Sequence, residues 1–492
     1  MDLFPLDPAV QLEKSSVVSF SRLNGLVNRI AAGLPVPPGS IVPVCLDPSV
    51  ELIASIIGIL QCGATYVILD PTGSVERNRY IIEEVNACLV VTDKKYSGFF
   101  SQPILVSTLL EEDPSLARRK DARYNPPHVD PATPAYIIYP SGSTGKPKGV
   151  TISHAAASLG ISHFSLNGNR RWLLIFNPIF SAAQRTILAT LCKGGCLCLA
   201  SKDRLSTSLH DVIENMKVDG IGITPSMLAT LPPSNTSTSL KQITTVGESL
   251  SAAILDAWAK KVHLRSSYGL SEFAQLNFSR RLQQGDPPNL VGKPCDTTSA
   301  YVLFPDSTEI APVGADGELC LVGPQLSDGY INQPSESAKS FVNNPFGTGR
   351  MFRTGDLARQ HSDGTFEILG RLDRQIKLQG QRLEPDEVSA VLHKHKGVVI
   401  TAVVAADVNN IKALVAAVVP CQDQEWTQLV SELRQIAQQC LPAFMVPNYW
   451  IKFEHLPTNS NGKVHIRQIQ ARAEITSPQD MLGRSRPSTW TR

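Results

Sequence analysis

The sequence has no strong excess of charge of either sign and no segment that would direct it into or across a membrane. It has 46 basic and 44 acidic residues, a formal net charge of +2, so its overall charge offers no attraction to nucleic acid or to an anionic membrane. Its first ten residues, MDLFPLDPAV, contain acidic residues and prolines, where a secretory signal needs a basic start and an unbroken apolar stretch. We therefore expect a cytoplasmic protein without nucleic-acid or membrane partners.

Long apolar stretches and paired cysteines are also scarce. The longest aliphatic stretch, 52–60, is about half of the roughly 20 residues that a helix needs to span a bilayer. Of the ten cysteines, only Cys192, Cys196 and Cys198 cluster, and they lack the CxxC spacing and the nearby histidines of a zinc site. We therefore expect free thiols and no structural metal, with GGCLCLA forming a buried strand.

The order of apolar segments predicts an α/β fold. Helix-like and strand-like segments alternate from about residue 17, as in the strand TYVILD at 65–70, the amphipathic helix at 75–84 and the strand CLVVTD at 88–93. Short β-like runs within 290–370 predict a β-rich subdomain. We expect a mixed α/β and α+β fold, in which a large N-terminal domain of stacked α/β sheets is followed by a small, mobile α+β C-terminal domain.

The chain is too long for a single core, because it has 492 residues. A charged, glycine-punctuated stretch begins at about Gly370, and we place a domain boundary there. We expect a nucleotide- and acid-binding core over 1–370, a small C-terminal domain over 371–475 and a flexible tail over 476–492. The tail is polar and contains several Arg, Ser and Pro residues.

The segment PSGSTGKPKGV at 140–150 has the composition of a polyphosphate-binding loop. It follows the strand AYIIY at 135–139 and contains three glycines, three hydroxyl residues and two lysines in eleven positions. Glycines let main-chain N–H groups approach phosphate oxygens, and lysines supply compact positive charge. A Walker P-loop is excluded, because Gly142 and Gly145 are too close and Pro147 follows Lys146. The alternative is a basic surface hairpin.

This loop resembles the phosphate-binding signature of the adenylate-forming superfamily, which includes acyl-CoA synthetases, luciferases and the adenylation domains of nonribosomal peptide synthetases. Further segments that resemble superfamily motifs follow in the expected order over nearly the whole chain. They are LQCGATYVILDP (60–71), SYGLSE (267–272), GELCLVGPQLSDGYIN (317–332), FRTGDLAR (352–359), GRLDRQIKLQGQRLEPDEV (370–388) and NGKV (461–464). The amino-acid sequence of these segments is most similar to that of a fungal peptide-synthetase adenylation domain.

The resemblance implies ATP-dependent activation of a small carboxylic acid as an acyl-adenylate, with release of pyrophosphate. The acyl group would then pass to the phosphopantetheine thiol of a peptidyl carrier domain. No carrier-type serine motif follows Lys463, so we expect a single adenylation unit and a carrier outside this chain.

The resemblance also implies roles for individual residues. Attack of a carboxylate on a phosphate brings two anions together, so positive charge is needed at the reacting atoms, and Lys463 matches the catalytic lysine. Glu272 matches the ligand of Mg²⁺, a cation that prefers oxygen, and Thr144 would assist it. Asp373 matches the hinge of the small domain, and Gly380 a loop that lines the thiol channel. The residues expected to bind ATP or AMP are Ser141, Gly142, Ser143, Thr144, Gly145, Lys146, Lys148, Gly247, Glu248, Ser249, Ser267, Tyr268, Gly269, Ser271, Asp356 and Arg371.

Ser181 stands where amino-acid-activating relatives have an aspartate that pairs with the α-ammonium group of the substrate. A serine cannot neutralise an ammonium group, and burying that charge alone is costly. We therefore expect an acid without a free α-amino group, such as an aryl acid, a keto or hydroxy acid, or an N-blocked amino acid. The other expected pocket residues are Ala182, Arg185, Gly222, Thr244, Val246, Gln275 and Leu276. Gly222 would leave room for a bulky group, and Arg185 would pair either with a second acidic group on the substrate or with a protein carboxylate.

Three alternatives remain at this point. The chain could activate an ordinary amino acid whose ammonium group is bound by a residue other than Ser181. It could instead be an aryl- or acyl-CoA ligase that uses coenzyme A as the acceptor. It could also be a degenerate nucleotide-binding scaffold. Lys463, Glu272, Asp356 and Arg371 are all present, which argues against the scaffold.

Overall fold

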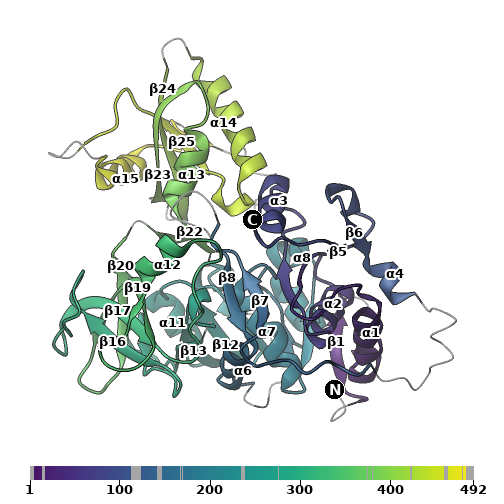
Figure 1. Ribbon diagram of the computed structural model, residues 1–492. Helices are drawn as coiled ribbons and strands as arrows, with labels where there is room; N and C mark the ends of the chain where they lie inside the picture. Colours follow the sequence, from purple (N-terminus) through teal and green to yellow (C-terminus); the bar gives the residue numbers. More distant parts are fainter. Residues whose placement is uncertain are drawn as a thin grey trace. The chain divides into compact units, whose positions relative to one another are not determined.

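The computed structural model describes residues 5–13, 17–111, 124–140, 147–166, 168, 170–233, 239–274, 276–373, 375–378, 381–409, 411–421, 424–458, 464–478 and 480–483. The chain divides into two compact units (Figure 1). The first unit contains Met1–Pro71, Ile81–Tyr139 and Lys148–Asp373, and the second contains Thr72–Tyr80, Pro140–Pro147 and Arg374–Arg492. The second unit combines segments that are distant in sequence, so one boundary does not describe it, and the domain limits given above stay predictions.

One mixed sheet of the first unit carries several of the expected acid-pocket residues. Its strand order is β14-β13-β12-β11-β9-β10-β1-β2, with parallel pairing from β1 to β13 and antiparallel pairing at both edges. The buried stretch predicted from GGCLCLA is β10, which confirms that prediction. The strands are β1 (Pro8–Leu12), β2 (Val17–Ser19), β9 (Arg171–Leu173), β10 (Cys196–Leu199), β11 (Gly220–Ile223), β12 (Gln242–Val246), β13 (His263–Tyr268) and β14 (Phe278–Arg281).

A second sheet of the same unit leads into the predicted phosphate loop. Its order is β6-β5-β3-β4-β7-β8, parallel except for the last pair. The strands predicted at 65–70, 88–93 and 135–139 are present as β4, β5 and β7. The strands are β3 (Ile41–Cys45), β4 (Thr65–Ile68), β5 (Val90–Thr92), β6 (Pro103–Leu105), β7 (Pro134–Ile138) and β8 (Val150–Ser153).

Several helices begin after a serine that accepts a hydrogen bond from the first turn. Ser49 accepts from the backbone N–H of Leu52, and Ser153 from that of Ala156, which satisfies an otherwise orphaned donor.

The helix predicted over 75–84 is present with those bounds. Among the described residues, no helix has both the length and the apolar character needed to cross a membrane. The helices are α1 (Phe20–Gly33), α2 (Val50–Gln61), α3 (Val75–Glu84), α4 (Val106–Leu110), α6 (His154–Ser162), α7 (Ser181–Cys192), α8 (Lys202–Thr207), α9 (Leu209–Asn215), α10 (Pro225–Leu228), α11 (Ala252–Trp258) and α12 (Pro334–Ser340).

The predicted β-rich subdomain is an antiparallel sheet in the order β15-β20-β19-β17-β16, with β18 paired to β19. Its long strand β19 is paired on both sides, so side chains from three strands are held in a fixed register. The strands are β15 (Leu290–Gly292), β16 (Ser299–Leu303), β17 (Asp316–Val322), β18 (Phe341–Asn343), β19 (Arg350–Gln360) and β20 (Phe366–Arg371).

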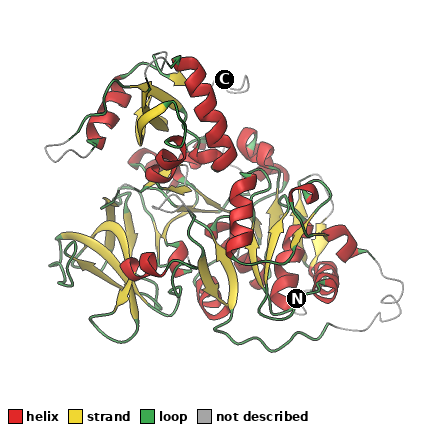
Figure 2. Ribbon diagram, turned by 45° about the horizontal axis from the view of Figure 1, so that its top comes forward, coloured by secondary structure: helices red, strands yellow, loops and turns green. Residues whose placement is uncertain are grey.

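The second unit combines helices with a sheet, as the predicted α+β class requires (Figure 2). In its core, Leu429 and Leu433 of α14 pack with Trp450 and Leu414 of the sheet β23-β24-β25-β26. A separate hairpin is formed by β21 and β22. The elements are β21 (Ile376–Leu378), β22 (Gln381–Leu383), α13 (Pro385–Leu392), β23 (Val398–Val408), β24 (Ile411–Pro420), α14 (Trp426–Cys440), β25 (Tyr449–Lys452), α15 (Ile466–Ile475) and β26 (Leu482–Gly483).

Candidate active site

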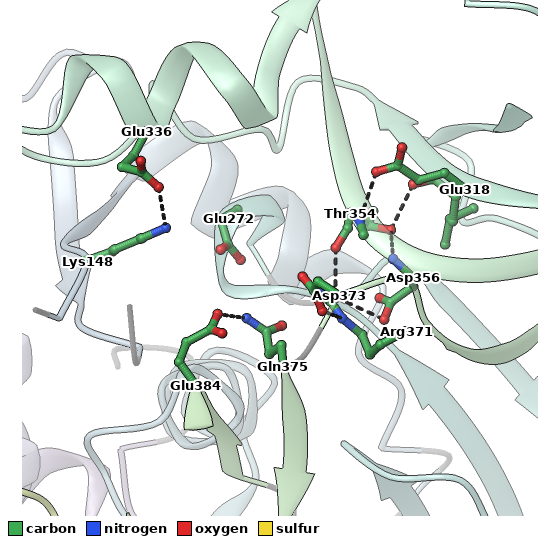
Figure 3. A network of polar contacts seen from close by, with 12 residues as sticks. Lys148, Glu272, Glu318, Glu336, Thr354, Asp356, Arg371, Asp373, Gln375 and Glu384 are labelled. Atoms are coloured by element: carbon green, nitrogen blue, oxygen red, sulfur yellow. Dashed lines mark hydrogen bonds and ion pairs between the residues drawn. The ribbon is translucent and has the colours of Figure 1, made fainter. Parts of the chain in front are cut away.

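Asp356 and Arg371, both expected at the nucleotide, are direct partners across β19 and β20. Arg371 Nη1 lies 3.1 Å from Asp356 Oδ1, and the Asp356 side chain is 2% exposed. Arg371 Nε also donates to Asp373 Oδ1 at 2.9 Å, so the expected hinge residue belongs to the same cluster (Figure 3). Burial by itself would lower the pKa of Arg371, but its hydrogen bonds to Asp373 and Asp356 and their charges raise it above the usual value. The guanidinium therefore keeps its charge.

The strand that carries Asp356 is anchored by polar contacts from β17. Thr354 Oγ1 donates to the carbonyl of Leu319 at 2.8 Å and accepts from the backbone N–H of Asp356 at 3.0 Å. Gly355 lies between them with φ of 70°, and its N–H donates to Glu318 Oε1 at 3.0 Å. A Cβ at Gly355 would lie 2.8 Å from Arg371 Nη2. Glycine is needed here both for the positive φ and for the close approach of the guanidinium.

Tyr268, expected to pack against adenine, ends β13 with its hydroxyl directed at Asp356. The hydroxyl donates to Asp356 Oδ2, and the ring packs edge-on against Phe278, with 5.7 Å between the centroids. Burial, followed by the charge of Asp356, raises the pKa of Tyr268 well above its usual value. The phenol therefore stays protonated and acts as a donor to the carboxylate.

Glu272, the expected magnesium ligand, lies in the short 3-10 helix η3 (Ser271–Phe273) and is fully buried. Its Oε1 accepts a hydrogen bond of 2.9 Å from the hydroxyl of Tyr330. Its backbone carbonyl accepts from the N–H of Ser327 at 2.9 Å. These contacts fix both the main chain and the carboxylate of Glu272, and a buried, oriented carboxylate is a suitable ligand for a hard cation.

Lys148, at the end of the predicted phosphate loop, pairs with an acidic residue on α12. Its Nζ lies 3.0 Å from Glu336 Oε2 and 5.1 Å from the centroid of the Tyr330 ring. Hydrogen bonds from Lys339 and Lys148 lower the pKa of Glu336. Tyr330 thus contacts both Lys148 and Glu272, which are drawn together in Figure 3.

Ser181, Ala182 and Arg185 lie in the first turns of α7. The hydroxyls of Ser181 and Ser271 are 2.8 Å apart, so α7 begins beside the segment that carries Glu272. The Arg185 side chain is 5% exposed, and its guanidinium carbon lies 5.7 Å from the centroid of the Phe164 ring. Burial lowers the pKa of Arg185 to about 10.

Of the remaining pocket residues, Leu276 is buried in the segment between β13 and β14, and three others lie on neighbouring strands of the mixed sheet. Gly222 pairs with Thr244 between β11 and β12, and Val246 pairs with Ser267 between β12 and β13. A Cβ at Gly222 would lie 3.1 Å from Cε2 of Phe176, so this aromatic ring occupies the space beside the glycine.

The expected adenine loop follows β12. Gly247 has φ of 91°, and Glu248 Oε2 accepts from the backbone N–H of Ser226 at 3.1 Å and from its hydroxyl at 2.6 Å. These bonds tie the loop to the start of α10. Ser249 is exposed and Gly269 is partly buried.

Several predicted residues lie outside the described residues: Ser141, Gly142, Ser143, Thr144, Gly145, Lys146, Gln275, Gly380 and Lys463. In the part of the chain that the structure describes, no group of three or more His, Cys, Asp or Glu side chains could hold a metal ion. The ten cysteines are free thiols.

Sequence reasoning did not single out Thr354, Glu318, Tyr330 or Glu336. Thr354, Glu318 and Tyr330 lie inside segments that resemble superfamily motifs. Their position in these motifs is the sequence feature that could have indicated a functional role. Glu336 lies between the segments 317–332 and 352–359, outside any motif, and only its partner Lys148 is part of one.

Comparisons with known proteins find similar proteins over nearly the whole chain. The profile of the AMP-binding enzyme family matches residues 3–331, and that of the AMP-binding enzyme C-terminal domain matches 387–463. Nonribosomal peptide synthetase sidE of Aspergillus fumigatus is 50% identical over 483 residues, which are 98% of this chain and 23% of that protein. The chain therefore spans less than a quarter of the length of this relative, which is fungal, as predicted.

Two solved structures are similar in fold. o-Succinylbenzoate CoA synthetase (MenE) from Bacillus subtilis has a TM-score of 0.81 at 22% identity, covering 96% of each chain. Holo-PA1221, described as a nonribosomal peptide synthetase protein containing adenylation and PCP domains, has a TM-score of 0.79 at 24% identity, covering 96% of this chain and 82% of that one. At these identities the likeness concerns the fold alone.

Proposed function

Because this chain belongs to the family of AMP-binding enzymes and is an adenylate-forming ligase, we propose that it activates a carboxylic acid without a free α-amino group. In the first half-reaction, a carboxylate oxygen of the acid attacks the α-phosphorus of ATP, pyrophosphate leaves, and an acyl-adenylate forms. In the second, a thiol attacks the acyl carbon and AMP leaves. The thiol would be the phosphopantetheine of a carrier domain.

The nucleotide half of this proposal is supported by the Asp356 and Arg371 cluster. A carboxylate held by Arg371 and by the Tyr268 hydroxyl is an acceptor suited to two ribose hydroxyls, and the guanidinium adds donors. We assign adenine packing to the ring of Tyr268 and to the loop of Gly247, Glu248 and Ser249. Asp373, hydrogen-bonded to Arg371, is assigned to the hinge.

The phosphates are assigned to the loop from Ser141 to Lys146 with Lys148, and magnesium to Glu272 with Thr144. When bound, magnesium neutralises phosphate charge during the displacement. The Tyr330 hydroxyl donates to Oε1 of Glu272 and so fixes the orientation of this carboxylate. Lys463 is assigned to the substrate carboxylate and the α-phosphate, where a point positive charge offsets repulsion between the two anions.

The acid assignment depends on one observation, the neutral Ser181. Its hydroxyl is 2.8 Å from that of Ser271, so the group at this position supplies hydrogen bonds and no negative charge. An α-ammonium buried there would lose its hydration without a counter-ion. An acid with hydrogen, hydroxyl, carbonyl or acylated nitrogen at that position avoids this cost.

A second candidate function differs only in the acceptor. The MenE structure is that of a CoA synthetase, and coenzyme A ends in the same thiol as a carrier. We favour the carrier because sidE is named a nonribosomal peptide synthetase and is 50% identical to this chain.

The test is acid-dependent exchange of labelled pyrophosphate into ATP. We would screen the common amino acids and a panel of aryl, keto, hydroxy and N-acylated acids, with Lys463→Ala as the inactive control. Exchange confined to acids without a free α-amino group, and lost in the variant, supports the proposal. Exchange with an ordinary amino acid would keep the enzyme class and overturn the substrate assignment. Thioester formation on an added carrier, compared with free coenzyme A, then identifies the acceptor.

A further inference from the structure

We propose that Glu318 and Arg353 form a positioning pair for the nucleotide site, because together they hold the main chain that carries Asp356. This inference rests on the nucleotide assignment proposed above and adds two residues to it. Neither Glu318 nor Arg353 touches the nucleotide. They act through the backbone of Gly355, and their effect is discrimination between ribose and deoxyribose.

The pairing of β17 with β19 is irregular at the residue assigned to the ribose. The register of the two strands shifts between Glu318 and Cys320. As a result, residues 354–356 of β19 lie opposite the single residue Leu319 of β17. Such a bulge takes its residues out of the regular ladder of hydrogen bonds. Because buried main-chain groups need partners, the position of 354–356 depends on the groups that replace the ladder.

Glu318 supplies one of these groups and is itself held by Arg353. Its Oε1 accepts from the N–H of Gly355 at 3.0 Å. Its Oε2 accepts from Arg353 Nε at 2.9 Å and also from Nη2. Arg353 is fixed in turn, since its Nη1 donates to the carbonyl of Ser307 at 3.0 Å. The Glu318 and Arg353 side chains are 9% and 18% exposed, so water competes little for these bonds.

The other polar groups of the bulge have partners close to the nucleotide site (Figure 3). The N–H of Asp356 donates to Thr354 Oγ1 at 3.0 Å, and the carbonyl of Thr354 accepts from Arg371 Nη1 at 2.7 Å. Glu318 binds the residue directly before Asp356. Gly355 has no side chain, so it can be held only through its main chain. Loss of the Glu318 carboxylate would remove the acceptor of this N–H and favour a shift of the main chain.

A small shift of Asp356 matters because hydrogen bonds depend on distance and direction. A carboxylate that accepts from two ribose hydroxyls must place its oxygens about 3 Å from both. Movement of the Gly355 main chain displaces this carboxylate, and it affects the ribose contacts more than contacts to the base or the phosphate. The expected result is a weaker preference for ribose over deoxyribose.

A matched control lies on the same two strands. Asp316 of β17 pairs in register with Arg359 of β19, and their side chains form an ion pair of 2.7 Å. Both side chains are more exposed than those of Glu318 and Arg353, and the pair lies outside the bulge. Substitution of Asp316 therefore removes an acidic residue from the same strand without removing the acceptor of the Gly355 N–H.

The experiment measures the dissociation constants of AMP, 2′-deoxyAMP and 3′-deoxyAMP by calorimetry on the full chain. The ratio between a deoxy analogue and AMP isolates one ribose hydroxyl, whereas a general loss of stability would weaken all three nucleotides alike. We expect the wild type to prefer AMP about tenfold or more over at least one analogue. Glu318→Ala should lower this preference to about threefold or less, and Asp316→Ala should keep it. Glu318→Gln should retain part of it, because an amide oxygen can still accept from Gly355.

A double substitution keeps the test valid if Glu318→Ala does not fold. That variant leaves the guanidinium of Arg353 without its carboxylate, which is destabilising. Glu318→Leu combined with Arg353→Met removes both charges, a change that buried ion pairs commonly tolerate. It still leaves the Gly355 N–H without its acceptor, so it should also lose the preference for AMP. The Tm of each variant reports its folding separately from this preference.

The outcomes separate this inference from the proposed function. Asp356→Asn should itself weaken the preference, and adding Glu318→Ala should weaken it no further, because Glu318 acts through Asp356. A preference that is weakened in Asp356→Asn but kept in Glu318→Ala and in the double variant would leave the ribose assignment standing and overturn the positioning role. Additive losses would also overturn that role. A wild type that binds AMP and both deoxy analogues equally would overturn the ribose assignment and this inference together.

Discussion

Arg371 and Asp356 form an ion pair of 3.1 Å across neighbouring antiparallel strands, and the Tyr268 hydroxyl donates to the same carboxylate. Asp356 is 2% exposed and Arg371 13%, so water screens the pair little. A surface pair on the same sheet, Asp316 and Arg359, has an N–O distance of 2.7 Å but exposures of 45% and 36%. The two pairs thus differ chiefly in burial, which makes the exposed pair a suitable control.

Asp356→Asn should raise the KM for ATP about tenfold or more, because it removes a charged acceptor assigned to the ribose. The measurement is pyrophosphate exchange at saturating acid and varied ATP. Asp316→Asn should change the KM for ATP less than about twofold, since exposed ion pairs contribute little. Equal effects of the two substitutions would show that Asp356 does not contact the nucleotide.

Tyr330→Phe removes the hydroxyl that donates to Glu272 Oε1 at 2.9 Å. We expect the magnesium concentration for half-maximal exchange to rise roughly tenfold, because residues that orient a metal ligand commonly influence affinity on that scale. The KM for the acid should change little. Tyr301→Phe is the control, since Tyr301 stacks on Phe346 in the same unit, with 4.6 Å between the centroids. A lower rate with an unchanged magnesium dependence would refute the positioning role of Tyr330.

Burial lowers the pKa of His154 from its ordinary value of 6.5. In the unfolded chain the imidazole takes up a proton near the ordinary value, whereas the folded state resists protonation until a lower pH. Below about 6.5 the unfolded state binds more protons, so stability falls as the pH decreases. His154→Gln should reduce the fall of Tm between pH 7 and pH 5, measured by calorimetry. A fall of Tm in His154→Gln as steep as in the wild type would show that His154 does not cause this pH dependence.

The local elements were the most predictable part of the fold. The helix over 75–84 has the predicted bounds, and the strand predicted at 135–139 is β7 (Pro134–Ile138). Both have a clear apolar pattern, period 3.6 in the helix and a continuous run in the strand, that depends only on neighbours in sequence. Sequence motifs could also name Asp356 and Arg371 as candidates.

The contacts within the site could not be predicted in the same way. Tyr330 is 58 residues from Glu272, and Lys148 is 188 from Glu336, so tertiary packing alone brings these pairs together. The sequence indicated open space at Gly222, but it could not show that Phe176 lies against this glycine. A motif gives residue types and spacing, whereas a hydrogen bond also needs the register of strands that are distant in sequence.

Two glycine-to-alanine substitutions, one at a closely packed position and one at an open position, test how tightly the structure packs around Gly220. A Cβ at Gly220, at the start of β11, would lie 2.3 Å from Cε3 of Trp172, whose side chain is 1% exposed. Gly220→Ala must therefore displace the indole or the strand, which should cost about 1–3 kcal/mol or more of unfolding free energy. The shift would also reach Gly222 and Thr244, which pair two residues further along, so the KM for the acid should rise.

Gly25→Ala is the opposite case, because Gly25 is exposed on α1 and a Cβ there meets nothing within 4 Å. Alanine has the higher helix propensity, so this variant should be stabilised by about 0.5–1 kcal/mol. Chemical denaturation of both variants measures the two effects against one wild type. If Gly220→Ala were as stable as Gly25→Ala, the contact between β11 and Trp172 would have to be looser than the structure shows, and the pocket beside it would tolerate larger side chains.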